Sequence, residues 1–220
     1  LREQKANIKP PARYAEVYAG PSILDSHGGK LRIWDEPQAG KAYDIGVDVA
    51  QGMGKDEDLT DNRDNTVAVV LERGSCKQVA EWVSRAIDPF ELATHLYWLG
   101  MYYNQAQVAV EVNNIGGGTN NQLSKMGYPN VYIWRYRDEA VPRYSKKTGW
   151  ETSPKSKAWL VGFTNHELIN GRFQVRSEFL LKEMETYMRL GQREWGAAPG
   201  YHDDRIQAFM IALIAADDEN

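Results

Sequence analysis

Acidic residues interrupt apolar stretches at three places in the chain. Asp48 lies inside IGVDVA, Glu111 lies inside VAVEVN, and the adjacent Asp203 and Asp204 open the apolar run near the C-terminus. A charge in a buried strand is costly unless it is paired or binds a metal ion. Carboxylates that converge without basic partners repel one another, so a site that they share needs a cation.

The oxygen ligands of such a site favour the hard cations Mg²⁺ or Mn²⁺. Two such ions about 4 Å apart can clamp the attacking water and the leaving oxygen of an in-line displacement at phosphorus. The carboxylates therefore predict phosphodiester hydrolysis, provided that the fold brings them together.

Each carboxylate also has a purely structural explanation. Asp48 could cap a turn or pair with a buried arginine, and Glu111 could lie at an exposed strand end. The Asp203–Asp204 pair suits a helix N-terminus, where the helix dipole favours negative charge. By helical phase, Asp203 should lie nearest the apolar face, with Asp204 rotated by about 100°.

The surrounding pattern predicts an α/β fold: a mixed sheet of three antiparallel strands followed by parallel strands, with helices on both faces. Residues 1–41 are expected as a lead-in or linker segment packed on a domain spanning 42–220. The expected strands are 31–34, 42–50, 66–73, 77–85, 107–113, 131–134 and 173–177. The expected helices begin at Asp88-Pro89 and cover 116–126, 153–171, 177–190 and 202–216, with a polar loop or hairpin at 135–153 and a loop at 191–200.

Composition is that of an ordinary globular domain. The chain has 220 residues, 42% hydrophobic and 25% charged, and no apolar run approaches the roughly 20 residues that span a bilayer. The single cysteine, Cys76, cannot form an internal disulfide, which fits a reducing compartment. The net charge of −4 argues against a strong nucleic-acid binder, yet residues 135–176 carry nine Lys/Arg against four Asp/Glu.

Several basic and polar residues are candidates for supporting roles. Lys155 and Lys157 belong to a helix start and could hold a DNA phosphate, or they could form a solvated first turn. A second basic group could lie over the DNA backbone or have no role: Arg143, Lys146 and Lys147.

Two further residues could assist the chemistry. Asp64 could orient water or shape its loop, and His202 could transfer protons or pack at the helix start. The tryptophans invite base stacking, but Trp82, Trp98 and Trp159 occur in apolar patterns that favour core packing.

Five stretches of the chain, in order, resemble the C-terminal nuclease domain of the large terminase subunit of tailed bacteriophages. They are YDIGVDVAQG, RDNTVAVVL, VAVEVNNIGGGTNNQL, GWETSPKSKAWLV and YHDDRIQA, and the resemblance spans residues 31–216. It implies an RNase H-like, RuvC-type fold and metal-dependent cutting of concatemeric viral DNA. It also implies that Asp48 and Glu111 are metal ligands, with Asp203 and Asp204 as the third corner of a two-ion site.

The resemblance further implies partners and a compartment. The partners are double-stranded DNA, a portal protein, a small terminase subunit and an N-terminal ATPase motor. The compartment is the cytoplasm of the host cell, and no membrane is involved. The chain contains no GxxxxGK[ST] phosphate loop, so the motor is absent from it.

Other functions compete with this one. A RuvC-like junction resolvase or a transposase-like enzyme would have nearly the same site. DIGVDVAQG also resembles the first strand of sugar kinases and actin-like ATPases, which however need a second phosphate hairpin and a longer chain. The chain could also be a docking module that binds a portal or DNA and has lost catalysis. Such a module would not need all the carboxylates.

Overall fold

The computed structural model describes residues 1–18, 20, 23–50, 65–85, 87–113, 116–137, 144–192 and 194–217. Its helices are α1 (Arg2–Lys5), α2 (Pro89–Tyr102), α3 (Gly116–Lys125), α4 (Pro154–Ile169), α5 (Glu178–Thr186) and α6 (Asp204–Asp217). Its strands are β1 (Arg13–Val17), β2 (Ile23–Asp25), β3 (Leu31–Ile33), β4 (Tyr43–Asp48), β5 (Thr66–Glu72), β6 (Lys77–Ser84), β7 (Gln107–Val110), β8 (Ile133–Arg137), β9 (Tyr144–Thr148), β10 (Tyr187–Arg189) and β11 (Trp195–Ala197).

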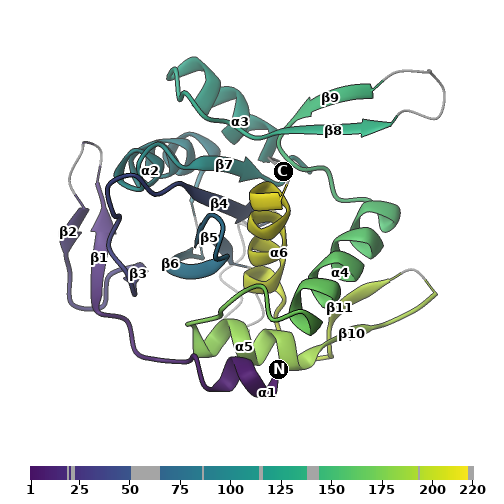
Figure 1. Cartoon of the computed structure of the whole chain (residues 1–220). Coiled ribbons are helices and arrows are strands. Elements are labelled where there is room, and N and C mark those ends of the chain that lie inside the picture. Colours follow the sequence, from purple (N-terminus) through teal and green to yellow (C-terminus); the bar gives the residue numbers. More distant parts are fainter. Residues whose placement is uncertain are drawn as a thin grey trace.

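Seven strands form one mixed sheet in the order β2-β1-β3-β6-β5-β4-β7. The strands β4, β5 and β6 pair antiparallel as consecutive neighbours, and β7 then pairs parallel to β4. Helices α2 and α3 lie on one side of this sheet, and α6 packs on its other side, with α4 and α5 packed against α6 (Figure 1). The predicted fold class, a mixed sheet with helices on both faces, is confirmed.

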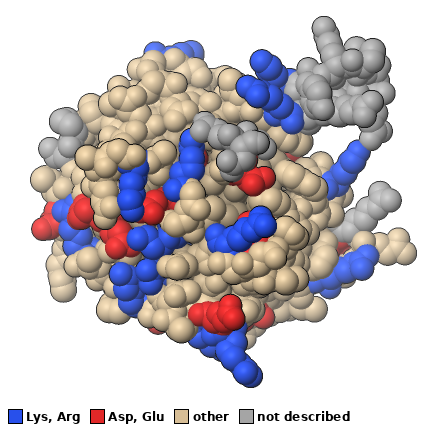
Figure 2. Space-filling model, in the orientation of Figure 1, with Lys and Arg blue, Asp and Glu red and all other residues tan. Residues whose placement is uncertain are grey.

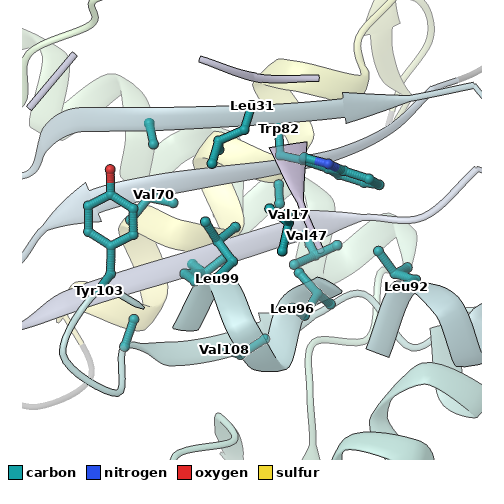
Figure 3. Packing of buried hydrophobic residues seen from close by; sticks show 14 of the residues in the cluster. Val17, Leu31, Val47, Val70, Trp82, Leu92, Leu96, Leu99, Tyr103 and Val108 are labelled. Atoms are coloured by element: carbon teal, nitrogen blue, oxygen red, sulfur yellow. The ribbon is translucent and has the colours of Figure 1, made fainter. Parts of the chain in front are cut away.

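The central strand β5 shows how the sheet is buried on both faces. Ala68 and Val70 belong to the cluster that contains α2, whereas Val67 and Val69 belong to the cluster that contains α6. Successive side chains of a strand point to opposite faces, so an unbroken apolar run fits a strand covered on both sides. Figure 3 shows the first cluster, where leucines of α2 pack against valines of β4, β5 and β7.

Several elements differ from the sequence prediction. Residues 1–41 supply β1, β2 and β3 to the main sheet, although 31–34 was the one strand expected there. Residues 173–177 do not form a strand; Gln174 makes an isolated bridge to Lys77. The helix expected over 177–190 ends at Thr186, because the chain turns into the β10–β11 hairpin, whose second strand occupies the expected loop 191–200.

The region after β7 also departs from the prediction. Val131 makes a single parallel bridge to Val108, and β8 pairs with β9 in a separate hairpin at residues 133–148. That hairpin is one of the two forms expected for 135–153, and it projects from the body of the domain (Figure 1). No helix in the described ranges is long and apolar enough to cross a membrane.

The tryptophans do not all lie in the core. Trp82 is 1% exposed and Trp98 packs partly buried against the first cluster, as predicted. Trp159 is 50% exposed, so the prediction of a core position is wrong for this residue. It lies on the outer part of α4, where the helical pattern alone did not distinguish the covered face from the open one.

Candidate active site

Asp48 and Glu111 lie side by side at one edge of the sheet. Val47 of β4 is in register with Val110 of β7, and the amide of Glu111 donates to the Val47 carbonyl at 2.9 Å. Because the two strands are parallel, Asp48 and Glu111 follow their neighbours at the same carboxyl edge. Both side chains line the same cavity.

The electrostatics of Asp48 follow from this position. Burial, and then the negative charges of Glu111, Asp204 and Asp203, raise the pKa of Asp48 well above its ordinary range. Desolvation and like charge both disfavour the ionised form, so they act in the same direction. A cation between these oxygens would remove that penalty.

Asp204 is the first residue of α6 and is 4% exposed. Its Oδ2 accepts hydrogen bonds from the backbone amide of Asn65 at 2.9 Å and from the Asn65 side chain at 2.8 Å. Asp203 precedes the helix, its side chain is 30% exposed, and its Oδ2 lies 3.8 Å from Lys157 Nζ. The helical-phase prediction is therefore wrong: Asp204 is the buried member of the pair, because Asp203 lies outside the helix.

These four carboxylates line one cavity of about 210 Å³. The other lining residues are Val49, Ala50, Asn113, Thr152, Lys157 and Gln207. The structure thus brings together the three acidic positions that the sequence singled out, from two strands and one helix.

Close packing sets the distance between the helix and the strands. A Cβ atom at Gly46 of β4 would lie 2.1 Å from the Ala208 carbonyl oxygen and 2.2 Å from the Ala212 amide nitrogen. The backbone of α6 therefore touches the backbone of β4, which glycine permits because it has no side chain. This contact holds Asp204 near Asp48.

Lys157 reaches the cavity through the segment that follows the β8–β9 hairpin. Asn113 donates to the Thr152 carbonyl at 2.6 Å and accepts from the Thr152 amide at 3.1 Å, which fixes the segment beside Glu111. Ser153 then caps α4 in a reciprocal pair with Ser156, and Pro154 occupies the first turn. Lys157 follows in the same turn, with its side chain 23% exposed.

A buried network of charges supports the start of α6 from the other side. The Glu183 carboxylate accepts from the amides of Arg205 at 2.7 Å and Ile206 at 3.1 Å, and from Arg205 Nη1 at 2.8 Å. Arg205 also contacts Glu81 at 3.4 Å, and Glu81 accepts from Arg32 at 2.5 Å. Burial raises the pKa of Glu183 to about 7, although Arg205 lowers it.

The side chains of the cavity suit a hard divalent cation by their chemistry. The donors are carboxylate, amide and hydroxyl oxygens, which are the ligands that hard divalent cations prefer. Over the described ranges, no group of three or more His, Cys, Asp or Glu side chains is already arranged to hold a metal ion. Asp204 is held by Asn65 and Asp203 is turned toward Lys157, so metal binding would exchange contacts within the cavity.

The remaining candidates lie at different distances from this cavity. His202 Nδ1 is 3.9 Å from Asp204 Oδ2, whereas Lys155 is exposed and is not among the cavity residues. Lys146 and Lys147 lie on β9, where Lys147 pairs with Glu151. Asp64 and Arg143 lie outside the described residues.

Sequence reasoning did not identify the residues that support the site. Asn65 holds the Asp204 carboxylate, Asn113 holds Thr152 beside Glu111, and Glu183 holds the first turn of α6. Asn65 directly precedes β5, and Asn113 lies three residues after the end of β7. A polar residue beside an apolar strand is a usable signal for the end of a sheet. Glu183 has no such signal, because it is one of several acidic residues in an amphipathic helix.

No protein-family model matches the chain, and no curated protein matches it. The chain does match solved structures. The large terminase nuclease from thermophilic phage G20c with bound magnesium superposes with a TM-score of 0.68 at 16% identity, covering 96% of this chain and 94% of that one. The same nuclease with bound cobalt gives 0.63 at 18% identity, covering 86% and 89%.

A third structure is the large terminase nuclease domain of Thermus phage P74-26, with a TM-score of 0.63 at 18% identity. It covers 96% of this chain and 91% of that one. At such identities the likeness concerns the fold, which extends over nearly the whole chain. The described domain has the RNase H-like fold of the large terminase nucleases of thermophilic phages.

Proposed function

We propose that this chain is a metal-dependent DNA endonuclease of the large-terminase type, which cuts concatemeric viral DNA during genome packaging. The observation that carries the proposal is the cavity in which Asp48, Glu111, Asp203 and Asp204 meet. The fold adds support, because its solved relatives include a terminase nuclease with bound magnesium and one with bound cobalt.

We assign the metal ligands to the four carboxylates, with two Mg²⁺ or Mn²⁺ ions as the proposed cofactor. Asp48 would be held in its ionised form on binding, and Asp203 would leave Lys157. Bound divalent ions supply Lewis acidity that activates water and stabilises negative charge at phosphorus.

The other residues of the cavity would bind and orient the DNA. Lys157 places an ammonium group at the cavity rim, where release from Asp203 lets it bind a phosphate oxygen. Asn65 holds the Asp204 carboxylate, so that the oxygen facing the cavity keeps one orientation. His202, about a third exposed beside Asp204, is the proposed group for proton exchange with solvent.

The wider setting follows from the same proposal. The substrate is double-stranded DNA, and an ATPase motor, a portal protein and a small terminase subunit deliver it in the host cytoplasm. The net charge of −4 agrees with such delivery, since the domain alone would attract DNA weakly.

The test is cleavage of supercoiled plasmid with Mn²⁺ or Mg²⁺, with a chelator as the blank. We expect nicking by the wild type and its loss, by at least about 100-fold, in Asp48→Asn, Glu111→Gln and Asp203→Asn/Asp204→Asn. The matched control is Asp25→Asn, which changes an exposed carboxylate of β2 that pairs with Arg13. Equal cutting by the wild type and Asp48→Asn would refute the site.

A synthetic four-way junction separates the competing nuclease. Cutting of junctions with linear duplex left intact would identify a resolvase, whereas comparable cutting of plain duplex supports the terminase assignment. If the wild-type protein binds DNA but does not cut it with either metal, the result supports a docking module instead of a nuclease.

A further inference from the structure

A row of four aromatic rings runs from the edge of the cavity to the open surface of α4. Trp134 of β8 and Trp150 have ring centroids 4.8 Å apart. Trp150 and Trp159 of α4 stack at 5.9 Å with planes 20° apart, and Trp159 and Phe163 stack at 6.0 Å and 27°. We call these four residues the aromatic row.

The inner part of the row is fixed to the candidate active site. Trp150 is fully buried, and its carbonyl accepts from the amide of Val112 at 2.7 Å, next to Glu111. Its indole N–H donates to Thr152, a residue of the cavity lining, at 3.1 Å. A displacement of Trp150 would therefore move the rim of the cavity.

The outer part of the row is open. Trp159 is half exposed, and Trp134 and Phe163 are partly exposed. A large aromatic surface left in water on a helix loses the free energy of burial, and flat rings of this kind are the surfaces on which nucleobases stack. Every base has such a face, so the contact needs no particular sequence.

Two cations lie beside members of the row. Lys147 is directly opposite Trp134 in the β8–β9 register, so the two side chains share a face of the hairpin. Lys155 precedes Trp159 by one helical turn, which places both on the same side of α4. In Figure 2, basic side chains border the β8–β9 hairpin at the upper right, whereas charges of both signs mix over the opposite side.

Lys147 is paired with Glu151, and both side chains are more than 40% exposed. Such a surface pair is weak, so a DNA phosphate can replace the carboxylate at low cost. Exposed aromatic rings with cations beside them suit a single strand of nucleic acid, whose bases stack and whose phosphates bind cations.

We infer that the aromatic row is a stacking platform for an unpaired DNA base beside the cleavage site, with Trp159 as its contact residue. A base inside an intact duplex has no free face, so the row selects DNA that is locally single-stranded. The inference rests on the proposed function, because it gives the nuclease a preferred form of substrate.

The experiment measures the binding of one fluorescently labelled oligonucleotide as a single strand and as a duplex, by anisotropy without metal. We expect Trp159→Ala to weaken single-strand binding by about 5- to 100-fold and to change duplex binding less than about twofold. Trp159→Phe should restore most of the affinity. The matched control is Ile169→Ala, which removes an 83% exposed apolar side chain from the far end of α4.

Trp159→Leu keeps apolar bulk without an aromatic face, and it serves if Trp159→Ala does not fold. Unchanged single-strand binding, or equal losses for both DNA forms, would overturn the inference. Plasmid cleavage by Trp159→Ala separates the two proposals. If Trp159→Ala cuts plasmid normally with metal and its single-strand binding is unchanged, the stacking platform is refuted and the nuclease proposal stands. If the wild type never cuts DNA, the nuclease proposal itself is refuted.

Discussion

Glu183 of α5 and Arg205 of α6 are joined by two hydrogen bonds, from the Arg205 backbone amide at 2.7 Å and from its guanidinium at 2.8 Å. The same carboxylate accepts from the amide of Ile206 at 3.1 Å. Glu183 thus supplies the acceptor that the first turn of α6 lacks within the helix. It does so one residue away from Asp204.

Replacing Glu183 should destabilise the domain and displace the start of α6. Glu183→Ala leaves Arg205 buried without this partner, which costs about 3–5 kcal/mol, and Glu183→Gln should cost less because it keeps an acceptor oxygen. Urea unfolding measures both. The control is Glu185→Ala in the same helix, whose exposed pair with Lys5 is worth at most about 1 kcal/mol. Equal losses for Glu183→Ala and Glu185→Ala would contradict this role.

The metal-free domain should lose stability as the pH rises. The pKa of Asp48 is raised in the folded state above the value of about 3.9 in an unfolded chain. Its protonation therefore favours folding fully below about pH 4, and that contribution disappears as the pH rises through the raised pKa. Glu183, with a pKa of about 7, acts in the same direction.

The measurement is thermal unfolding from pH 5 to pH 8 in chelator. Asp48→Asn should gain stability relative to the wild type as the pH rises, and saturating Mg²⁺ should stabilise the wild type more than the variant. If the difference in stability between wild type and variant does not change with pH, ionisation of Asp48 does not destabilise the folded domain.

Gly46→Ala should be strongly destabilising, because its Cβ would overlap backbone atoms of Ala208 and Ala212 that cannot rotate away. We expect a loss of about 3 kcal/mol or more, with α6 pushed off β4. Gly162→Ala is the matched control, since nothing lies within 4 Å of a Cβ in that turn of α4. It should stabilise by roughly 0.5–1 kcal/mol. Chemical unfolding of both variants checks the contrast.

Cys76 should react slowly with thiol reagents in the folded protein. Burial raises the pKa of its thiol to about 11, so little thiolate is present near neutral pH. We expect labelling by a chromogenic disulfide at pH 8 to be at least about tenfold slower than in urea-unfolded protein. Equal rates would show that the β5–β6 turn leaves the thiol open to solvent.

The sequence pattern predicted the elements that are buried on both faces. The continuous apolar runs of β4, β5 and β7 and the capped starts of α2 and α4 appear within a few residues of the predicted limits. The β10–β11 hairpin was missed, because strands of three residues contain too few positions to show an alternation. Their pairing depends on contacts, which local pattern does not encode.

The acidic positions of the candidate site were visible because each breaks an apolar run. Their supporting residues were not visible: Asn65 reaches Asp204 across 139 positions of chain. Trp159 was misplaced for a related reason: α4 is weakly amphipathic, so its sequence does not indicate which face packs on α6 and which stays open. Which face of a helix is covered is a property of its neighbours.

The packing of α6 on β4 also bears on how the domain is made. Of the four carboxylates, Asp48 is synthesised first, Glu111 next, and Asp203 and Asp204 after both. A growing chain on the ribosome therefore has no complete cavity until α6 has emerged and docked against Gly46. Under the proposed function, the nuclease would be inactive until α6 has docked, because the cavity is incomplete before then.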